Sequence, residues 1–217
     1  MNKKHSKIIN QKRAFIVFEG GEKSGKSTVI KSLNSELTKL EFDILVTHEP
    51  GGTPLGKVIR EKLLKKEDGI SINPVAESFL FFADRAQHVS DVVLPALRKD
   101  KIVLEDRFSF STFAYQHYAR GVDINFLLQA DAISRQNLDP ELVIFLDIDP
   151  EIALKRGIDP SNPFETAKLE FHNKLRHGYL EMAHNDHEKW KVVDASNSAD
   201  KVAKEVLKIV LEFLKRK

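Results

Sequence analysis

The sequence contains no cysteine and no long run of apolar residues. Without cysteine, disulfides, thiolate catalysis and cysteine-based zinc sites are excluded. No apolar stretch approaches the roughly 20 residues that a transmembrane helix needs. An excess of one charge is also missing: 34 Lys and Arg stand against 32 Asp and Glu, so the net charge of +2 gives no reason to expect nucleic-acid or membrane partners. These absences favour a soluble, cytoplasmic protein.

The length favours one domain, or one domain with a small insertion. The chain has 217 residues, and 41% of them are hydrophobic, which is enough for a substantial core. Residues 1–13 are basic and polar, and we interpret them as a disordered tail rather than a nucleic-acid-binding arm. Residues 14–217 are expected to form a single domain. Gly157, Pro160 and Pro163 interrupt the helical pattern, so we expect a mobile lid at about residues 155–170.

Short apolar runs alternate with longer helical patterns along the chain. The predicted strands are residues 14–19, 43–47, 102–105, 142–147 and 191–193. The predicted helices are residues 26–40, 54–65, 74–99, 109–118, 124–136, 150–156, 164–184 and 199–215. Such alternation is typical of an α/β protein with a mostly parallel five-stranded sheet and helices on both faces. Ligands of such sheets bind at the carboxyl ends of the strands.

The segment after the first predicted strand has the spacing of a phosphate-binding P-loop. The nine residues expected to bind ATP are Gly20, Gly21, Glu22, Lys23, Ser24, Gly25, Lys26, Ser27 and Thr28. Backbone N–H groups of this loop would surround phosphate oxygens, and the helix that follows adds the positive end of its dipole. Lys26 would reach the β- and γ-phosphates, and Ser27 would hold Mg²⁺. A solvated turn is the alternative.

Three arginines outside the P-loop indicate a second phosphate. Arg60, Arg85 and Arg107 lie in segments that could face one cavity. A guanidinium group pairs with a phosphate through two parallel hydrogen bonds. Because the P-loop already accounts for the donor phosphates, the additional arginines indicate an acceptor that also carries phosphate. This pattern favours a kinase over a simple hydrolase.

These segments together resemble the thymidylate kinase family, and its bacterial branch most closely. The resemblance runs from about residue 14 to about residue 215 and rests on motifs that occur in the family's order. They are residues 18–28 (Phe-Glu-Gly-Gly-Glu-Lys-Ser-Gly-Lys-Ser-Thr), 47–54 (Thr-His-Glu-Pro-Gly-Gly-Thr-Pro), 80–88 (Leu-Phe-Phe-Ala-Asp-Arg-Ala-Gln-His), 106–108 (Asp-Arg-Phe), 114–116 (Ala-Tyr-Gln), 119–121 (Ala-Arg-Gly) and 146–147 (Leu-Asp). The resemblance implies a P-loop kinase fold of three layers, ATP-dependent phosphorylation of dTMP with Mg²⁺, and a homodimer.

The resemblance also implies roles for residues around dTMP. Phe81 corresponds to the aromatic residue that stacks on thymine, and Arg85 to the arginine that reads the edge of the base. Arg60 and Arg107 correspond to the clamps on the acceptor phosphate. Glu22 corresponds to the carboxylate that holds the sugar 3′-hydroxyl.

The remaining positions carried over from the family lie in two neighbouring segments. Ser111, Thr112 and Gln116 are expected to make polar contacts with the base. Tyr115 is expected to exclude a ribose 2′-hydroxyl, and Asp106 to join the Mg²⁺ site through water. Each residue also has a structural alternative. Phe81 could belong to the core, and Arg85 could form a surface ion pair with Asp84.

The chain departs from the bacterial pattern in its expected lid and at one further position. The lid offers only Lys155 and Arg156, whereas the lids of bacterial relatives are rich in arginine. We hypothesise that Lys23 compensates by covering the transferred phosphoryl group, so the catalytic set is Lys23, Lys26, Arg107 and Arg156. The alternative is that Lys23 points to solvent. The second departure is His48, which stands where the family usually has arginine.

Two other functions stay open from sequence. Another nucleoside monophosphate kinase or a deoxynucleoside kinase would share the P-loop and differ around the base. A regulatory NTPase would be expected to carry a guanine-specific Asn-Lys-x-Asp motif, and the chain has none. We also expect Asp147 and Asp149 to cap the helix at Pro150 rather than to take part in catalysis.

Overall fold

Five parallel strands form one sheet in the order β2-β3-β1-β4-β5. The computed structural model describes residues 13–64 and 72–217. The strands are β1 (Ala14–Glu19), β2 (Ile44–His48), β3 (Ile102–Asp106), β4 (Leu142–Asp147) and β5 (Trp190–Asp194). The predicted parallel sheet is therefore confirmed, and no strand boundary moves by more than one residue.

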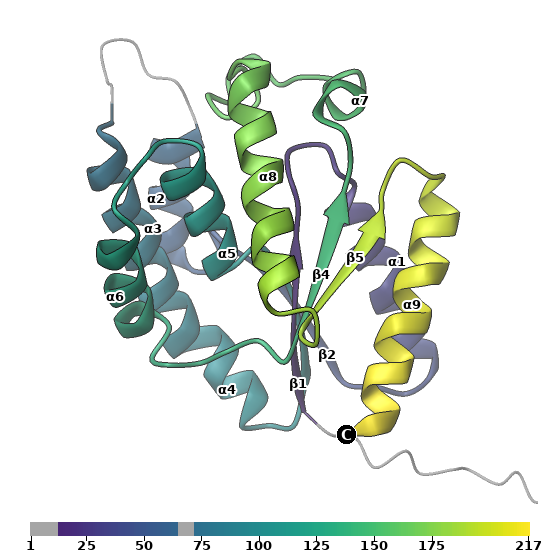
Figure 1. Ribbon diagram of the computed structural model, residues 1–217. Coiled ribbons are helices and arrows are strands. Elements are labelled where there is room, and N and C mark those ends of the chain that lie inside the picture. The colour runs from purple at the N-terminus through teal and green to yellow at the C-terminus, as the bar shows by residue number, and fades with distance from the viewer. Residues whose placement is uncertain (1–12, 65–71) are drawn as a thin grey trace, which may run out of the picture.

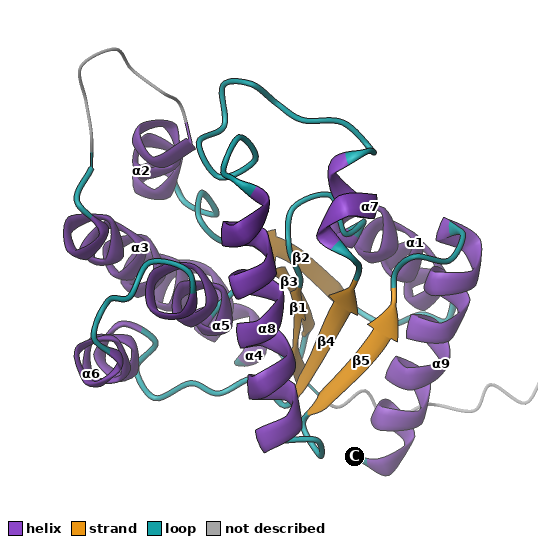
Figure 2. Cartoon of the chain, turned by 45° about the horizontal axis from the view of Figure 1, so that its top comes forward, coloured by secondary structure: helices purple, strands orange, loops and turns teal. Residues whose placement is uncertain are grey.

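Helices cover both faces of the sheet (Figures 1 and 2). They are α1 (Lys26–Lys39), α2 (Pro54–Leu64), α3 (Pro74–His88), α4 (Leu94–Leu97), α5 (Ser109–Thr112), α6 (Ile124–Ser134), α7 (Pro150–Leu154), α8 (Leu169–Asn185) and α9 (Ala199–Arg216), with π-helical segments η1 (Val89–Val93) and η2 (Phe113–Tyr118). Helices α1 and α9 pack on one face, whereas α8 and the continuous α3-η1-α4 pack on the other. Helices α2 and α6 pack against α3.

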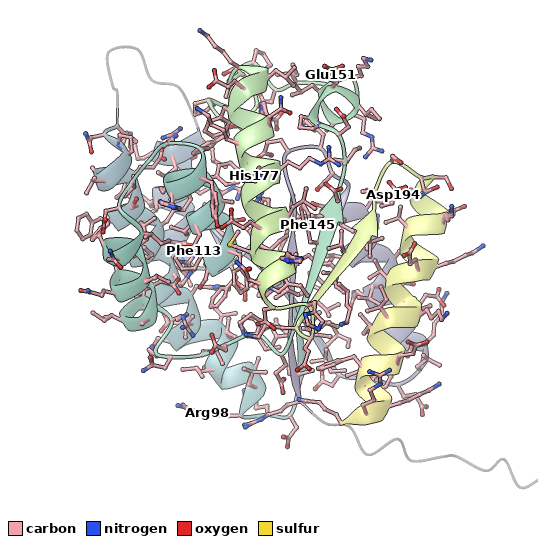
Figure 3. The ribbon with its side chains drawn as sticks, in the orientation of Figure 1. Arg98, Phe113, Phe145, Glu151, His177 and Asp194 are labelled. Carbon is pink, nitrogen blue, oxygen red and sulfur yellow. The ribbon has the colours of Figure 1, made fainter. Side chains whose placement is uncertain are left out.

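Alternation along β1 explains why both faces are covered. Ala14, Ile16 and Phe18 belong to the core under α1 and α9, whereas Phe15 and Val17 belong to the core under η1 and α4. Side chains alternate between faces along a strand, so a strand that is apolar throughout needs a layer on each side. On the second face, Phe145 of β4 stacks on Tyr179 of α8 at 5.1 Å between ring centroids, beneath the long helix of Figure 3.

The structure corrects two helix predictions. The predicted helix at 164–184 begins only at Leu169, since residues 164–168, including the buried Phe164, belong to the irregular segment before it. The predicted helix at 74–99 passes through a π-helical turn and ends at Leu97. Residues 1–12 of the predicted tail (residues 1–13) and residue 65, the predicted end of the second helix, lie outside the described residues. Among the described helices, none is both long and apolar enough to cross a membrane.

All five strands point the same way, so their carboxyl ends meet at one edge of the sheet. In Figure 1 this edge lies at the top, where the arrowhead of β4 points toward α7 and that of β5 toward the connection to α9. β1 lies between β3 and β4. The chain passes from β1 to β2 on one side of it, and from β3 to β4 on the other. Crevices at such a switch in strand order are the usual ligand sites of open α/β sheets.

Candidate active site

The loop after β1 is shaped to receive an anion. Gly20 has φ +151°, and an added Cβ would lie 2.7 Å from Ser24 Oγ and 2.9 Å from the Leu146 carbonyl oxygen. Helix α1 begins at Lys26, and no side chain caps its first N–H groups. The buried Lys26 ammonium donates to the carbonyl oxygens of Gly20 at 3.0 Å and Gly21 at 3.1 Å. Burial lowers the pKa of Lys26 to about 8.

Two cavities meet beside this loop. The larger measures about 1050 Å³ and runs from the P-loop to residues 195–202. The smaller measures about 150 Å³ and lies among residues of α2, α3, η2 and the segment before α8. Five residues line both cavities: Glu22, Glu49, Arg60, Arg107 and Glu165. A ligand in each cavity would therefore meet the other across a shared set of charged side chains.

The structure brings the residues predicted from sequence to these two cavities. All nine residues predicted around dTMP line the smaller one: Glu22, Arg60, Phe81, Arg85, Arg107, Ser111, Thr112, Tyr115 and Gln116. Seven of the nine residues predicted to bind ATP line the larger one, as do Asp106 and Arg156; Gly20 and Gly21 do not. The larger cavity also reaches Ala195 and Asn197, in the loop after β5.

Arg107 is held at the junction of the cavities. Its backbone adopts φ +70°, which is uncommon for a residue other than glycine. Its guanidinium donates to the Gly20 carbonyl oxygen and to Glu22 Oε1, each at 2.9 Å, and lies 5.3 Å from the centre of the Tyr115 ring. Burial would raise the pKa of Glu22, but Arg107 and Lys26 lower it to about 2. Glu22 is therefore a carboxylate at neutral pH.

Arg60 approaches the junction from α2. Its Nη1 donates to the Pro50 carbonyl oxygen at 2.8 Å, in a loop that begins with a cis Glu49–Pro50 bond. His48 lies along the same crevice, and burial together with Arg60 lowers the pKa of its imidazole. The position that usually carries arginine in the resembled family is therefore a neutral side chain here.

Arg85 is a buried residue and not half of a surface ion pair. Its side chain is 2% exposed. Its Nε donates to Glu49 Oε2 at 2.9 Å, its Nη1 to Asp131 Oδ1 at 2.9 Å and its Nη2 to Thr112 Oγ1 at 3.0 Å. Three of its five N–H donors are thus occupied, which leaves one hydrogen on each terminal nitrogen for a ligand in the smaller cavity.

Sequence reasoning assigned no role to His88, which joins the same network. Its Nδ1 lies 3.0 Å from Glu49 Oε1 and 3.1 Å from Glu105 Oε1, and its Nε2 lies 2.6 Å from Thr47 Oγ1. Burial alone would lower the pKa of His88, but Glu105 and Glu49 raise it to about 10. An added Cβ on Gly52 would come within 2.5 Å of this ring. A charged imidazole therefore supports the loop that carries Glu49.

Ser27 and Asp106 offer oxygen ligands at the mouth of the larger cavity. Ser27 Oγ donates to Asp106 Oδ2 at 3.1 Å. The other carboxylate oxygen, Asp106 Oδ1, is buried and has no hydrogen-bond partner among the described residues. A hydroxyl and a carboxylate beside a phosphate site are the ligands that Mg²⁺ prefers. The residues present therefore fit the predicted metal.

The comparisons with known proteins show the family of the chain. The thymidylate kinase family model matches residues 18–206. The chain is 43% identical over 206 residues to a thymidylate kinase of Pelotomaculum thermopropionicum, covering 94% of this chain and 95% of that protein. It is 42% identical over 196 residues to one of Syntrophotalea carbinolica, covering 87% and 90%.

The chain belongs to the thymidylate kinase family. A solved structure of thymidylate kinase from Ehrlichia chaffeensis has the same fold, with a TM-score of 0.77 and 27% identity over 92% of this chain and 99% of that one. The resemblance stated from the motifs is therefore confirmed.

This family member connects its P-loop to the α7–α8 segment (residues 155–168) in two ways. Lys23, at φ 57°, forms an ion pair with Glu165 at 2.9 Å between Nζ and Oε2. Arg156 donates to the carbonyl oxygens of Lys23 at 3.1 Å and Ala195 at 2.8 Å. Lys23 therefore does not simply point to solvent. Glu165 is a site residue that sequence reasoning missed, because its partner lies 142 positions earlier in the chain.

Phe164 is a second missed residue. It is 3% exposed and lines the smaller cavity, with its ring centroid 5.3 Å from that of Tyr115 and 6.5 Å from that of Phe81. The signal in the sequence was an aromatic residue directly after Pro163, at the position where the predicted helix began five residues too early. The α7–α8 segment thus forms part of the wall opposite Phe81.

The prediction for Asp147 was wrong, whereas the one for Asp149 is confirmed. Asp149 caps α7 by accepting from the Glu151 N–H at 2.8 Å. Asp147 instead accepts two hydrogen bonds from Arg176 of α8, at 2.7 and 2.9 Å. A bidentate guanidinium pair is stronger than a single cap bond, so Asp147 fastens α8 to the end of β4.

Proposed function

We propose that this chain transfers the γ-phosphoryl group of ATP to dTMP, with Mg²⁺, and so supplies dTDP for DNA synthesis. The observation that carries the proposal is the set of residues common to both cavities, above all Arg107. A phosphoryl group can pass directly only where donor and acceptor phosphates face each other. Membership of the thymidylate kinase family supports the identity of the acceptor.

In this proposal Lys26 and Arg107 provide positive charge on opposite sides of the transferred group. Lys26 now donates to carbonyl oxygens of its own loop, and phosphate oxygens of ATP would take their place. Arg107 would bind the dTMP phosphate while Glu22 keeps its guanidinium in place. Mg²⁺, held by Ser27 and through water by Asp106, supplies further charge neutralisation when bound. The nucleophile is a phosphate oxygen that is already anionic, so no general base is needed.

On the acceptor side, Phe81 would stack on thymine and Arg85 would donate to O4. Ser111, Thr112 and Gln116 complete the polar lining, and Tyr115 fills the space of a 2′-hydroxyl. Thymine and uracil differ by one methyl group, which discriminates by only about 1–3 kcal/mol. Some turnover of dUMP is therefore expected. Cytosine carries an amino group in place of O4, so CMP and dCMP would be poor substrates.

We also propose that residues 14–217 act as one catalytic domain, with the lid at about residues 155–170. Phe164 and Glu165 of this segment line the smaller cavity, and Glu165 lines both. Closing it over bound nucleotides would keep out water, the competing acceptor.

The proposed homodimer would form through α2, α3 and α6, on the left of Figure 1. Large apolar side chains are exposed on these helices: Leu55, Val58, Val75, Phe79, Leu128 and Ile133. A contiguous apolar patch on these helices would mark an interaction site. Light scattering during gel filtration tests it, and a monomer at micromolar concentration would contradict the proposal. The cytoplasmic location stays a prediction.

An ADP-release assay across dTMP, dUMP, CMP, AMP, GMP and thymidine tests the proposed function. We expect dTMP to have the highest kcat/KM and dUMP to follow. Preferred use of CMP, AMP or GMP would favour another nucleoside monophosphate kinase, and preferred use of thymidine would favour a deoxynucleoside kinase. ADP release that does not depend on any acceptor would favour a regulatory NTPase.

A further inference from the structure

The side-chain amide of Gln116 has a hydrogen-bonded nitrogen and an oxygen without a hydrogen-bond partner among the described residues. Gln116 is fully buried in η2 and lines the smaller cavity. Its Nε2 donates to Glu77 Oε2 at 2.7 Å. Its Oε1 is buried and has no hydrogen-bond partner among the described residues. A buried acceptor without a hydrogen-bond partner destabilises the fold, so we expect a bound ligand to donate a hydrogen bond to this oxygen.

Glu77 determines which half of the amide is free. An ionised carboxylate only accepts hydrogen bonds, so the amide must turn its NH₂ toward Glu77. Arg120 also donates to Glu77 Oε2, at 2.6 Å, and Glu77 lies in the first turn of α3, where the helix dipole favours negative charge. Burial raises the pKa of this 4%-exposed carboxyl group, whereas Arg120 and the Gln116 amide lower it and so favour the ionised form. The charge of Glu77 therefore accounts for the observed orientation of the Gln116 amide.

We propose that Glu77 is a positioning residue for base selectivity: it holds the Gln116 amide in the orientation in which Oε1 accepts the N3–H of thymine. This inference rests on the proposed function. Thymine presents a donor at N3 and an acceptor at O4, whereas cytosine presents an acceptor at N3 and an amino donor at C4. Gln116 Oε1 and the terminal nitrogens of Arg85 form the pattern complementary to thymine. With cytosine, the acceptor Oε1 of Gln116 would face the acceptor N3, and the N–H donors of Arg85 would face the amino donor at C4.

The proposal also explains why two residues meet on one carboxylate oxygen. If Arg120 alone held Glu77, the amide could rotate by half a turn and present NH₂ to the cavity. Cytosine N3 would then find a donor. With Glu77 in place, that rotation would bring Gln116 Oε1 against the carboxylate, so two acceptors would face each other in a buried site.

The test is Glu77→Gln, which keeps the size and removes the charge. Its amide can donate or accept, so Gln116 can turn either way. We expect the ratio of kcat/KM for dTMP to that for dCMP to fall at least about tenfold, through a higher KM for dTMP and better use of dCMP. Thermal unfolding of the variant checks that it is folded. An unchanged ratio in a folded variant would overturn the proposal.

Arg120→Met is the matched control. It removes the other partner of Glu77 and the guanidinium that lies over the Phe164 ring, 5.0 Å from its centroid, but it leaves the Glu77–Gln116 bond. We expect the dTMP to dCMP ratio to stay within about threefold of wild type. An equal fall in both variants would attribute selectivity to the ion pair and overturn the role of Glu77. Poor use of dTMP by the wild type would instead contradict the proposed function.

Discussion

The two sides of the phosphate crevice are built differently. On the acceptor side, Arg85 and His88 are almost completely buried and are paired with Glu49, Asp131 and Glu105. On the donor side, Lys23 and Arg156 lie nearer to solvent and are held by Glu165 and by carbonyl oxygens. Buried pairs resist rearrangement, because separating them leaves an uncompensated charge, whereas pairs nearer to solvent exchange partners at little cost.

This difference suggests a division of work. The acceptor side recognises one base and gains from a rigid pattern of donors and acceptors. The donor side must bind and release a triphosphate in each cycle, so its cations need partners that phosphate can replace. Arg107 lies between the two sides and has partners of both kinds, the Glu22 carboxylate and the Gly20 carbonyl oxygen.

The largest effect is expected at this junction. Arg107→Met removes the cation that both cavities share, so kcat/KM for dTMP should fall about 10³-fold. Steady-state kinetics measure it. The control is Arg98→Met, at an exposed arginine near the end of α4, far from the strands' carboxyl ends in Figure 3. A loss below tenfold at Arg107 would mean that the crevice does not depend on this residue.

On the acceptor side, the His88→Phe variant should be much less stable than the wild type. The change leaves Glu49 and Glu105 buried near each other, at a cost of about 3 kcal/mol in the free energy of unfolding. Because the pKa of His88 is raised to about 10, its contribution is complete below pH 6.5 and is lost as the pH rises through about 10. Urea unfolding at pH 7 and pH 10.5 measures it, with the exposed His177→Phe as control. Ordinary surface substitutions change the free energy of unfolding by up to about 0.5 kcal/mol. A decrease smaller than this at pH 7 in His88→Phe would contradict the account.

The sequence predicts those features that depend on local pattern. Apolar runs of five or six residues define the strands, and the spacing of Gly20, Gly25, Lys26 and Ser27 defines the P-loop. The predicted base and phosphate residues also line one cavity, because each follows a strand or lies on a helix beside the strand ends.

Pairings across the chain could not be predicted in the same way. Glu165 forms an ion pair with Lys23, and Asp147 accepts hydrogen bonds from Arg176 instead of capping α7. Both contacts exist only in the folded chain. Likewise, Asp84 and Arg85 are neighbours in sequence, yet Arg85 pairs with Glu49 and Asp131, because the helix turns them toward different partners. Ion pairs between residues far apart in the chain produce no regular spacing in the sequence, so sequence patterns do not predict them.

Turnover should also depend on Lys23, to a smaller extent. Lys23→Ala removes one charge-assisted bond to the transferring phosphates and should lower kcat roughly 10–100-fold. Lys155→Ala, at an exposed lysine beside Arg156, is the control. If Lys23→Ala leaves turnover intact while Arg156→Ala abolishes it, the compensating role belongs to Arg156 instead.

The smallest effect is expected from a substitution that tests whether phosphate can replace Glu165 as the partner of Lys23. Glu165→Gln frees Lys23 from its ion pair, so ATP should bind a few-fold more tightly; the gain is small because the Lys23 side chain is 34% exposed. Calorimetric titration with ATP measures it. In a Lys23→Met background the same change should have no effect. Equal weakening of ATP binding in both backgrounds would show that Glu165 serves only the fold.

A crystal structure with dTMP and a non-hydrolysable ATP analogue tests the central claim most directly. The account predicts the dTMP phosphate against Arg60 and Arg107, the terminal phosphate of the analogue against Lys26, and both in the space that the two cavities share. A dTMP phosphate bound away from both guanidinium groups would contradict it.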